Sequence, residues 1–231
     1  MRRSWWLVAV VGALALAFGA GCSSLGYYAQ SIHGHFAMLD AARPIPEVIA
    51  DPTSAATLKE RLERAQQMRV YATSELGLPD NGSYTRYADL KRPYVAWNVF
   101  ATPELSLELK QWCYPVVGCA GYRGYFDKAD AEAAAQALRS EGYEVNVAGV
   151  PAYSTLGWFS DPLLNTFIGG SEGQLAALLF HELAHQVVFV GGDTTFNESF
   201  ATAVEREGVK RWLASHGDAS ARAAYAEFAQ R

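Results

Sequence analysis

The stretch His181-Glu182-Leu183-Ala184-His185 decides how the rest of this sequence is interpreted. On a helix, two histidines four residues apart lie about one turn apart on one face, so both imidazoles can bind one cation. Glu182 lies beside them, where its carboxylate can take a proton from water. This HExxH pattern is typical of a zinc site with a general base, provided that the segment is helical.

The flanking residues predict that helix. Ser171 followed by Gln174 fits a capping box, and an apolar run begins at Leu175. The run stops at Gly191-Gly192, and glycines in this position predict the end of a helix. The ionisable residues of the motif are therefore expected inside an apolar helix rather than on a solvated face.

A second predicted helix, over residues 196–217, supplies an acidic residue. Glu198 is the expected third metal ligand, because two imidazoles and one carboxylate leave a fourth tetrahedral position open, as in catalytic zinc sites. Thr195, three residues earlier, also fits a capping box, in which Glu198 would bind backbone N–H groups instead. Glu205 is either a hydrogen-bond partner of a ligating histidine or a solvated helix residue.

The local charge supports a bound cation. Between Ser140 and Glu205 the sequence has eight acidic residues and no Lys or Arg. Glu182 and Glu198 lie in apolar surroundings, where a carboxylate without a partner is unfavourable. A divalent cation supplies the missing positive charge. Basic residues from elsewhere in the chain are the alternative.

The N-terminus predicts export and a lipid anchor. Residues 1–21 contain two arginines and then an apolar run from Trp5 to Phe18, which is short for a spanning helix and typical of a signal peptide. Cys22 follows small residues, as the lipidated cysteine of bacterial lipoproteins does. The alternatives are an ordinary signal peptide with a chance cysteine, and a simple transmembrane anchor. We expect a cell-envelope protein that is lipid-anchored and faces the periplasm, at the outer membrane.

The remaining chain, residues 22–231, has 17 basic and 24 acidic residues and a net charge of −7. This charge argues against nucleic acid or an anionic membrane surface as an electrostatic partner. Its 210 residues suffice for one domain with a substantial core. Cys113 and Cys119 suggest a local disulfide in an exported protein. A zinc-binding pair is the alternative, but no second Cys/His pair accompanies them.

Periodicity and turn residues predict an α+β arrangement. Helices are expected over residues 27–42 (interrupted at Gly34), 53–76, 127–140 and 219–231, and strands over 93–102 and 144–150. Pro44 and Pro46 predict an extended link. Tyr153, in an aromatic-rich loop over 151–162, is a candidate oxyanion donor. The alternative is that its ring only packs under the loop.

The motif and its downstream partner resemble those of the gluzincin metallopeptidases. The sequences His-Glu-Leu-Ala-His-Gln at 181–186 and Asn-Glu-Ser-Phe-Ala at 197–201 are most similar to those of the aminopeptidase-N group. Only twelve residues separate His185 from Glu198, which is a shorter spacing than in that group. The whole chain resembles a family of bacterial lipoprotein aminopeptidases. That resemblance rests on Tyr27-Tyr28, the cysteine pair with Tyr-Arg-Gly-Tyr-Phe at 122–126, and residues 152–159.

The resemblance implies one gluzincin-like metallopeptidase domain over residues 22–231. It implies a helix-rich fold with a small, mainly antiparallel sheet, an active-site helix and a glutamate-bearing helix. Zn2+ is then held by His181, His185 and Glu198, and Glu182 acts first as general base and then as general acid. In gluzincins a strand near the zinc binds the substrate backbone, and the candidate strand here covers residues 145–153.

The implied activity is hydrolysis of peptide bonds in peptide or protein substrates at the envelope, by an aminopeptidase. An aminopeptidase needs an acidic side chain for the substrate's ammonium group, and Glu144, Asp161 and Glu172 are the candidates. One alternative is an envelope endopeptidase. Another is a lipid-anchored binding or assembly protein with a non-catalytic metal site, which the intact Glu182 argues against.

Overall fold

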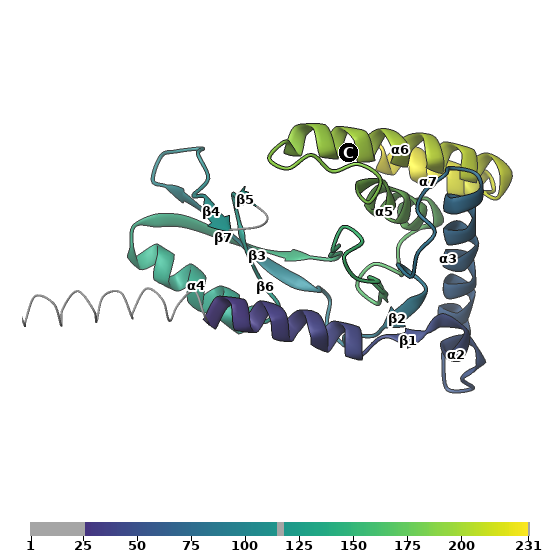
Figure 1. The fold of residues 1–231 in the computed structure, drawn as a ribbon, viewed down its shortest axis with the longest axis horizontal. Helices are drawn as coiled ribbons and strands as arrows, with labels where there is room; N and C mark the ends of the chain where they lie inside the picture. The colour runs from purple at the N-terminus through teal and green to yellow at the C-terminus, as the bar shows by residue number, and fades with distance from the viewer. Residues whose placement is uncertain (1–25, 115–117, 231) are drawn as a thin grey trace, which may run out of the picture.

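The computed structural model describes residues 26–114 and 118–230. In these ranges the chain is α+β and helix-rich, with small and mostly antiparallel sheets (Figure 1), so the predicted fold class is confirmed at that level. The predicted signal peptide over 1–21 and the predicted lipidation site Cys22 lie outside the described residues. No helix in the described ranges has both the length and the apolar character that crossing a bilayer requires.

A three-stranded antiparallel sheet and one covering helix form one side of the molecule (Figure 1). The elements are β3 (Ala96–Pro103), β6 (Arg123–Tyr125), β7 (Tyr143–Val150) and α4 (Lys128–Ser140), with strand order β6-β3-β7. Ala131 and Ala135 of α4 share a buried cluster with Trp97 and Val99 of β3. The central strand is thereby buried, while the outer edge of β7 pairs with no other described strand.

A disulfide closes a hairpin beside this sheet. The strands β4 (Trp112–Tyr114) and β5 (Gly118–Ala120) are antiparallel, with Cys113 directly opposite Cys119. The two sulfurs are bonded to each other. The predicted disulfide is confirmed, and the alternative of a zinc-binding pair is wrong because neither thiol remains free.

The first described helix, residues 26–40, leads into a second small sheet of β1 (Arg43–Pro44), β2 (Arg86–Ala88) and β8 (Leu163–Leu164). Two expectations in this region are wrong. Gly34 does not interrupt the helix, because the helix packs there directly on the Phe126 ring and only glycine fits the gap. Pro46 is not in an extended link but in the first turn of α2 (Ile45–Ala50), where a missing N–H is harmless.

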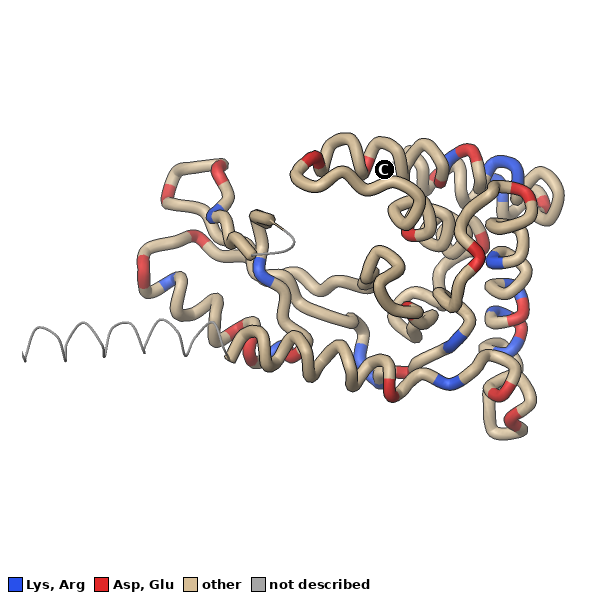
Figure 2. The backbone as a smooth tube through the Cα atoms, viewed as in Figure 1, with Lys and Arg blue, Asp and Glu red and all other residues tan. Residues whose placement is uncertain are grey.

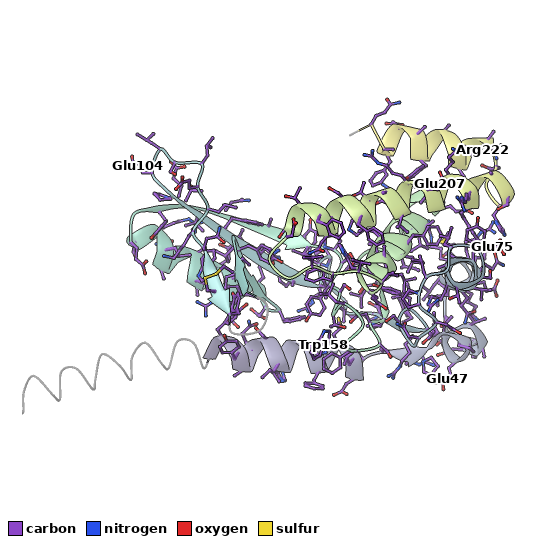
Figure 3. The ribbon with its side chains drawn as sticks, turned by 45° about the horizontal axis from the view of Figure 1, so that its top comes forward. Glu47, Glu75, Glu104, Trp158, Glu207 and Arg222 are labelled. Carbon is purple, nitrogen blue, oxygen red and sulfur yellow. A yellow bond between two sulfur atoms is a disulfide. The ribbon has the colours of Figure 1, made fainter. Side chains whose placement is uncertain are left out.

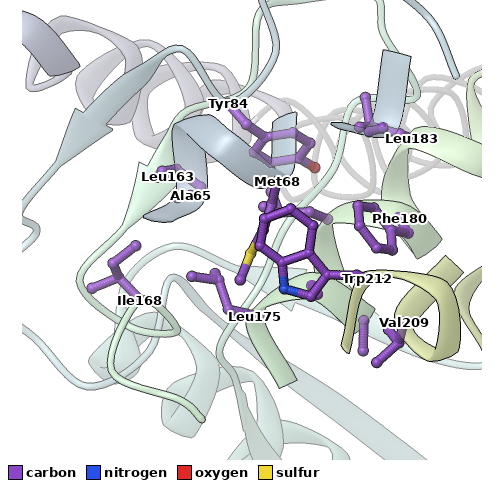
Figure 4. Close-up of a cluster of buried hydrophobic side chains, with 14 of the residues drawn as sticks. Ala65, Met68, Tyr84, Leu163, Ile168, Leu175, Phe180, Leu183, Val209 and Trp212 are labelled. Carbon is purple, nitrogen blue, oxygen red and sulfur yellow. The ribbon is translucent and has the colours of Figure 1, made fainter. Parts of the chain in front are cut away.

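The helices on the other side share the largest buried cluster. They are α2, α3 (Ala56–Ser74), α5 (Glu172–His185), α6 (Thr194–Ser215) and α7 (Ala219–Phe228). Figure 4 shows Trp212 of α6 at the centre of this cluster, with Phe180 of α5 and Met68 of α3 around it. Acidic and basic residues alternate along α3 (Figure 2). Helix α5 is therefore fixed by packing on both α3 and α6.

Candidate active site

Helix α5 presents the two histidines on one face. The predicted capping box is present at its start, where Ser171 and Gln174 bond each other's backbone N–H groups. Apolar side chains elsewhere on α5, including the fully buried Leu183, anchor the helix in the core. The rings of His181 and His185 have centroids 4.8 Å apart, as expected for residues one turn apart.

Helix α5 ends earlier than predicted. It stops at His185, and Gly191-Gly192 lie in the following turn. The residues after His185 include three valines, whose branched Cβ atoms disfavour a helix. In addition, the Asn197 side chain bonds both the N–H and the carbonyl of Val190, at 2.8 and 2.9 Å. These bonds hold the turn against α6 and bring its first turns beside the motif.

Glu198 does not cap its own helix. The N-cap of α6 is Asp193, whose carboxylate accepts the backbone N–H of Phe196 at 2.9 Å. The alternative of a capping box between Thr195 and Glu198 is therefore wrong. The carboxylate of Glu198 instead faces the two histidines of α5.

Three electron-pair donors converge between α5 and α6. Oxygens of Glu198 lie 3.2 Å from Nε2 of His181 and 3.6 Å from Nε2 of His185, and the two Nε2 atoms are 3.1 Å apart. Ligands bound to zinc at 2.0–2.1 Å in a tetrahedron are separated by about 3.3 Å. The spacing therefore fits the donor set of a zinc ion. Within the described ranges, no other group of three His, Cys, Asp or Glu side chains converges in this way.

Glu205 sets the tautomer of the first histidine. Its Oε2 lies 3.0 Å from Nδ1 of His181, and this hydrogen bond is the main cause that raises the pKa of that ring. A carboxylate can only accept, so Nδ1 carries a proton, and in the neutral ring Nε2 is then the nitrogen with the free lone pair. Of the two alternatives for Glu205, the hydrogen-bond partner is the one observed.

In the described ranges, no Lys or Arg pairs with the carboxylates of this cluster. Burial lowers the pKa of His185, which favours its neutral form. The ion pairs that Glu198 and Glu205 make with described residues involve only the two histidine rings. When both rings are neutral, their Nε2 lone pairs and the carboxylate face one another, and a divalent cation between them would relieve the repulsion.

Glu182 lies on the buried side of the same helix. Burial raises the pKa of its carboxyl, while the charge of His181 and a hydrogen bond from Ser154 oppose that rise. Tyr84 is fully buried nearby, and burial together with the charge of Glu182 raises the pKa of its phenol. A carboxylate with a raised pKa in a site of this kind is a suitable proton acceptor.

The loop over 151–162 is held firmly against the end of α5. The backbone N–H and hydroxyl of Thr155 donate to the buried carboxylate of Asp161 at 2.8 to 3.0 Å. Gln186, which follows the motif, packs on Gly157, whose φ of 83° and missing Cβ permit the close approach. This loop therefore positions Ser154 next to Glu182.

Tyr153, the candidate oxyanion donor, packs toward the first described helix. Its ring lies 5.8 Å from that of His35 and 5.4 Å from that of Phe126, measured between centroids. Within the described ranges no hydrogen bond or ring contact links it to His181 or His185. Its catalytic role stays a prediction.

Sequence reasoning missed three residues around the site. Ser154 lies in a loop that the sequence indicates through its aromatic residues and through the family resemblance of residues 152–159, without a role for Ser154 itself. Tyr84 lies in a segment without a recognisable motif, and Tyr122 begins the segment 122–126, which entered the family resemblance without a role in the site. The pKa of Tyr122 is raised by burial and then by the charges of Tyr27 and Glu198. The sequence signals that could have drawn attention to Tyr122 are its place in the segment 122–126, which carries the family resemblance, and its position directly after the disulfide hairpin.

Three acidic residues were candidates for binding the ammonium group of a substrate, and each bonds other residues or lies apart from the two histidines. Asp161 is fully buried and bonded to Thr155. Glu172 accepts the indole N–H of Trp212 at 2.9 Å. Glu144 lies at the start of β7, opposite Thr102 of β3. None of the three makes a contact that assigns it to substrate.

The comparisons with known proteins give one family. The sequence model of the family described as "Putative aminopeptidase" matches residues 26–231 of the chain. No curated protein and no solved structure matches it. The matched range includes α5, α6 and every residue of the cluster described above.

Proposed function

The chain belongs to this "Putative aminopeptidase" family, and from that premise we propose that it hydrolyses peptide bonds with a zinc ion held by His181, His185 and Glu198. Membership in an aminopeptidase family indicates a peptidase. The observation that carries the zinc dependence is the convergence of the two Nε2 atoms and the Glu198 carboxylate within 4.8 Å of one another. Zinc, when bound, polarises the scissile carbonyl and lowers the pKa of water.

Glu182 is the proposed proton carrier. Its carboxylate takes a proton from the attacking water as the water oxygen bonds to the carbonyl carbon. The same carboxyl then gives this proton to the amine nitrogen as the C–N bond breaks, so protons balance over the reaction. Burial raises the pKa of this carboxyl, which suits it to accept a proton and then to release it.

The substrate backbone has a candidate binding edge. Strand β7 is the last strand of its sheet, and its outer edge is unpaired among the described strands. An extended peptide can add to such an edge through main-chain hydrogen bonds. Tyr153, which follows three residues after β7, is the proposed donor to the developing oxyanion.

We further propose that the protein acts at the cell envelope. Residues 1–21 would serve as a signal peptide, and Cys22 would carry the lipid that anchors the chain to the outer membrane, facing the periplasm. The disulfide between Cys113 and Cys119 supports this location, because disulfides persist in oxidising compartments.

An endopeptidase is the second candidate. It is favoured by the burial of Asp161 and by the hydrogen bond that occupies Glu172, since neither carboxylate is presented to a substrate ammonium group. Peptides with free and with acetylated N-termini distinguish the two activities. An aminopeptidase cleaves only the free peptides, whereas an endopeptidase cleaves both.

The test of the proposed function combines metal content with turnover. We expect about one zinc ion per chain in the purified protein, and Glu182→Gln should retain this zinc while turnover falls by several orders of magnitude. The double change His181→Ala and His185→Ala should abolish zinc binding. Full turnover by Glu182→Gln would show that the proton carrier is assigned wrongly, and zinc retained without both histidines would show that the ion lies elsewhere.

A further inference from the structure

An exposed apolar ridge runs along the first described helix and onto the loop before α5. We define the apolar ridge as Tyr28, Ile32, Phe36, Trp158 and Phe159. The first three are spaced four residues apart and so lie on one face of the helix over 26–40. The rings of Phe36 and Phe159 are 6.1 Å apart, which joins the helix to the loop. Figure 3 shows Trp158 beside this helix.

The ridge is exposed to an extent that is unusual for such side chains. Trp158 is 80% exposed, Ile32 58% and Phe36 49%. Residues 26–39 contain no Lys, Arg, Asp or Glu, although 19% of the whole chain is charged. An uncharged helix face with large apolar residues is typical of a surface that is covered by a partner or a membrane.

The position of the ridge in the chain indicates its partner. The helix begins at residue 26, four residues after Cys22 and eight after the apolar run that ends at Phe18. Four residues of chain reach at most about 14 Å. An anchor at Cys22 therefore keeps the start of this helix within about 14 Å of the lipid surface, whatever path the linking residues take.

We propose that the apolar ridge lies on the lipid surface of the membrane to which the N-terminus is anchored. This inference rests on the anchoring that forms part of the proposed function. Tyr, Trp and Phe side chains are favoured at the boundary between headgroups and acyl chains. The contact is apolar rather than electrostatic, because residues 22–231 carry a net charge of −7 and the helix has no Lys or Arg.

The contact has a consequence for the site. Trp158 and Phe159 belong to the same loop as Ser154 and Tyr153, and Tyr153 contacts His35 of the ridge helix. Docking of the ridge on lipid fixes this loop between the membrane surface and α5. The candidate active site then keeps a fixed orientation relative to the lipid surface.

The test uses the full chain in phosphatidylcholine vesicles whose acyl chains carry bromine, which quenches tryptophan fluorescence on contact. We expect the brominated chains to quench the fluorescence of Trp158. The loss of fluorescence in brominated vesicles should therefore be smaller in Trp158→Phe than in the parent. The matched control is Trp112→Phe, in the disulfide hairpin, which should leave the quenching unchanged. The joint change Ile32→Ser and Phe36→Ser should reduce the quenching of Trp158 at least about threefold. Quenching should persist at high salt.

The outcomes separate the ridge from the anchor. Flotation of the protein with the vesicles reports the anchor, and quenching of Trp158 reports the ridge. Protein that floats with Trp158 unquenched overturns the ridge proposal and leaves the anchor intact, whereas protein that stays in the aqueous phase contradicts both. A concentration-dependent dimer in detergent that Ile32→Asp dissociates, with Trp158 unquenched in vesicles, would assign the ridge to a second copy of this chain instead.

Discussion

Replacing Glu205 by alanine should weaken zinc binding about 10- to 100-fold while the chain stays folded. The Glu205 carboxylate accepts Nδ1–H of His181 at 3.0 Å, and its side chain is only 19% exposed, so solvent replaces this bond poorly. Hydrogen bonds to charged groups contribute about 1.5–3 kcal/mol, which corresponds to about 10- to 150-fold in an equilibrium constant. Partners of metal-bound histidines commonly change affinity by about 10- to 100-fold.

The assay is competition between metal-free protein and a chelator of known zinc affinity, with circular dichroism as the check on folding. Glu205→Gln keeps an oxygen that accepts Nδ1–H but loses the charge, so its affinity should lie between those of the parent and Glu205→Ala. Glu207→Ala is the matched control, because Glu207 lies on the same helix, is exposed and pairs with Arg211 at 2.7 Å. Unchanged affinity in Glu205→Ala, or an equal loss in the Glu207→Ala control, would refute the reasoning.

Three further predictions concern the surroundings of the site. If Tyr153 donates to the oxyanion, Tyr153→Phe should lower kcat about 10²-fold with zinc content unchanged. The control Tyr122→Phe should then change kcat little. A large loss in Tyr122→Phe with little change in Tyr153→Phe would assign the role to Tyr122 instead. Burial raises the pKa of the Asp161 carboxyl above its ordinary value of 3.8. The folded state therefore favours the protonated carboxyl. The stability that this proton contributes is present below pH 3.8 and is lost as the pH rises through the raised pKa. Asp161→Asn should therefore gain stability relative to the parent between pH 4 and pH 7 in urea titrations, and a difference that does not vary with pH would contradict this. Changing Cys113 and Cys119 together to serine should lower the free energy of unfolding by about 2 kcal/mol, since the bond closes a short loop; zinc content should not change, and its loss would show that the hairpin supports the site directly.

The parts of the site that could be predicted from sequence are those that depend on short separations. His181 and His185 share a face because of helical geometry alone, and their distance follows from it. Glu198 follows after one short turn, so few chain paths are possible. The capping box at Ser171 and Gln174 depends on neighbouring residues only, and it too is present as predicted.

The end of α5 and the supporting contacts could not be predicted, because they depend on residues that meet only in the folded chain. The apolar run after His185 fits a longer helix, but the Asn197 side chain competes for the backbone of Val190. Likewise, Gly34 alone predicts a break in the helix. The structure shows instead that the ring of Phe126, over ninety residues later, packs against it. Ser154 approaches Glu182 only because Asp161 and Thr155 fold their loop back.

The short turn between α5 and α6 bears on the order of events during folding. The three proposed ligands span residues 181–198, and the connection between the two helices is only eight residues long. Local contacts form faster than pairings between distant segments, and metal binding is coupled to the ordering of its ligands. With the proposed zinc site, the unfolded chain should therefore bind its ion in a helical hairpin before β3 and β7, whose paired residues are 40 or more positions apart, have formed their sheet.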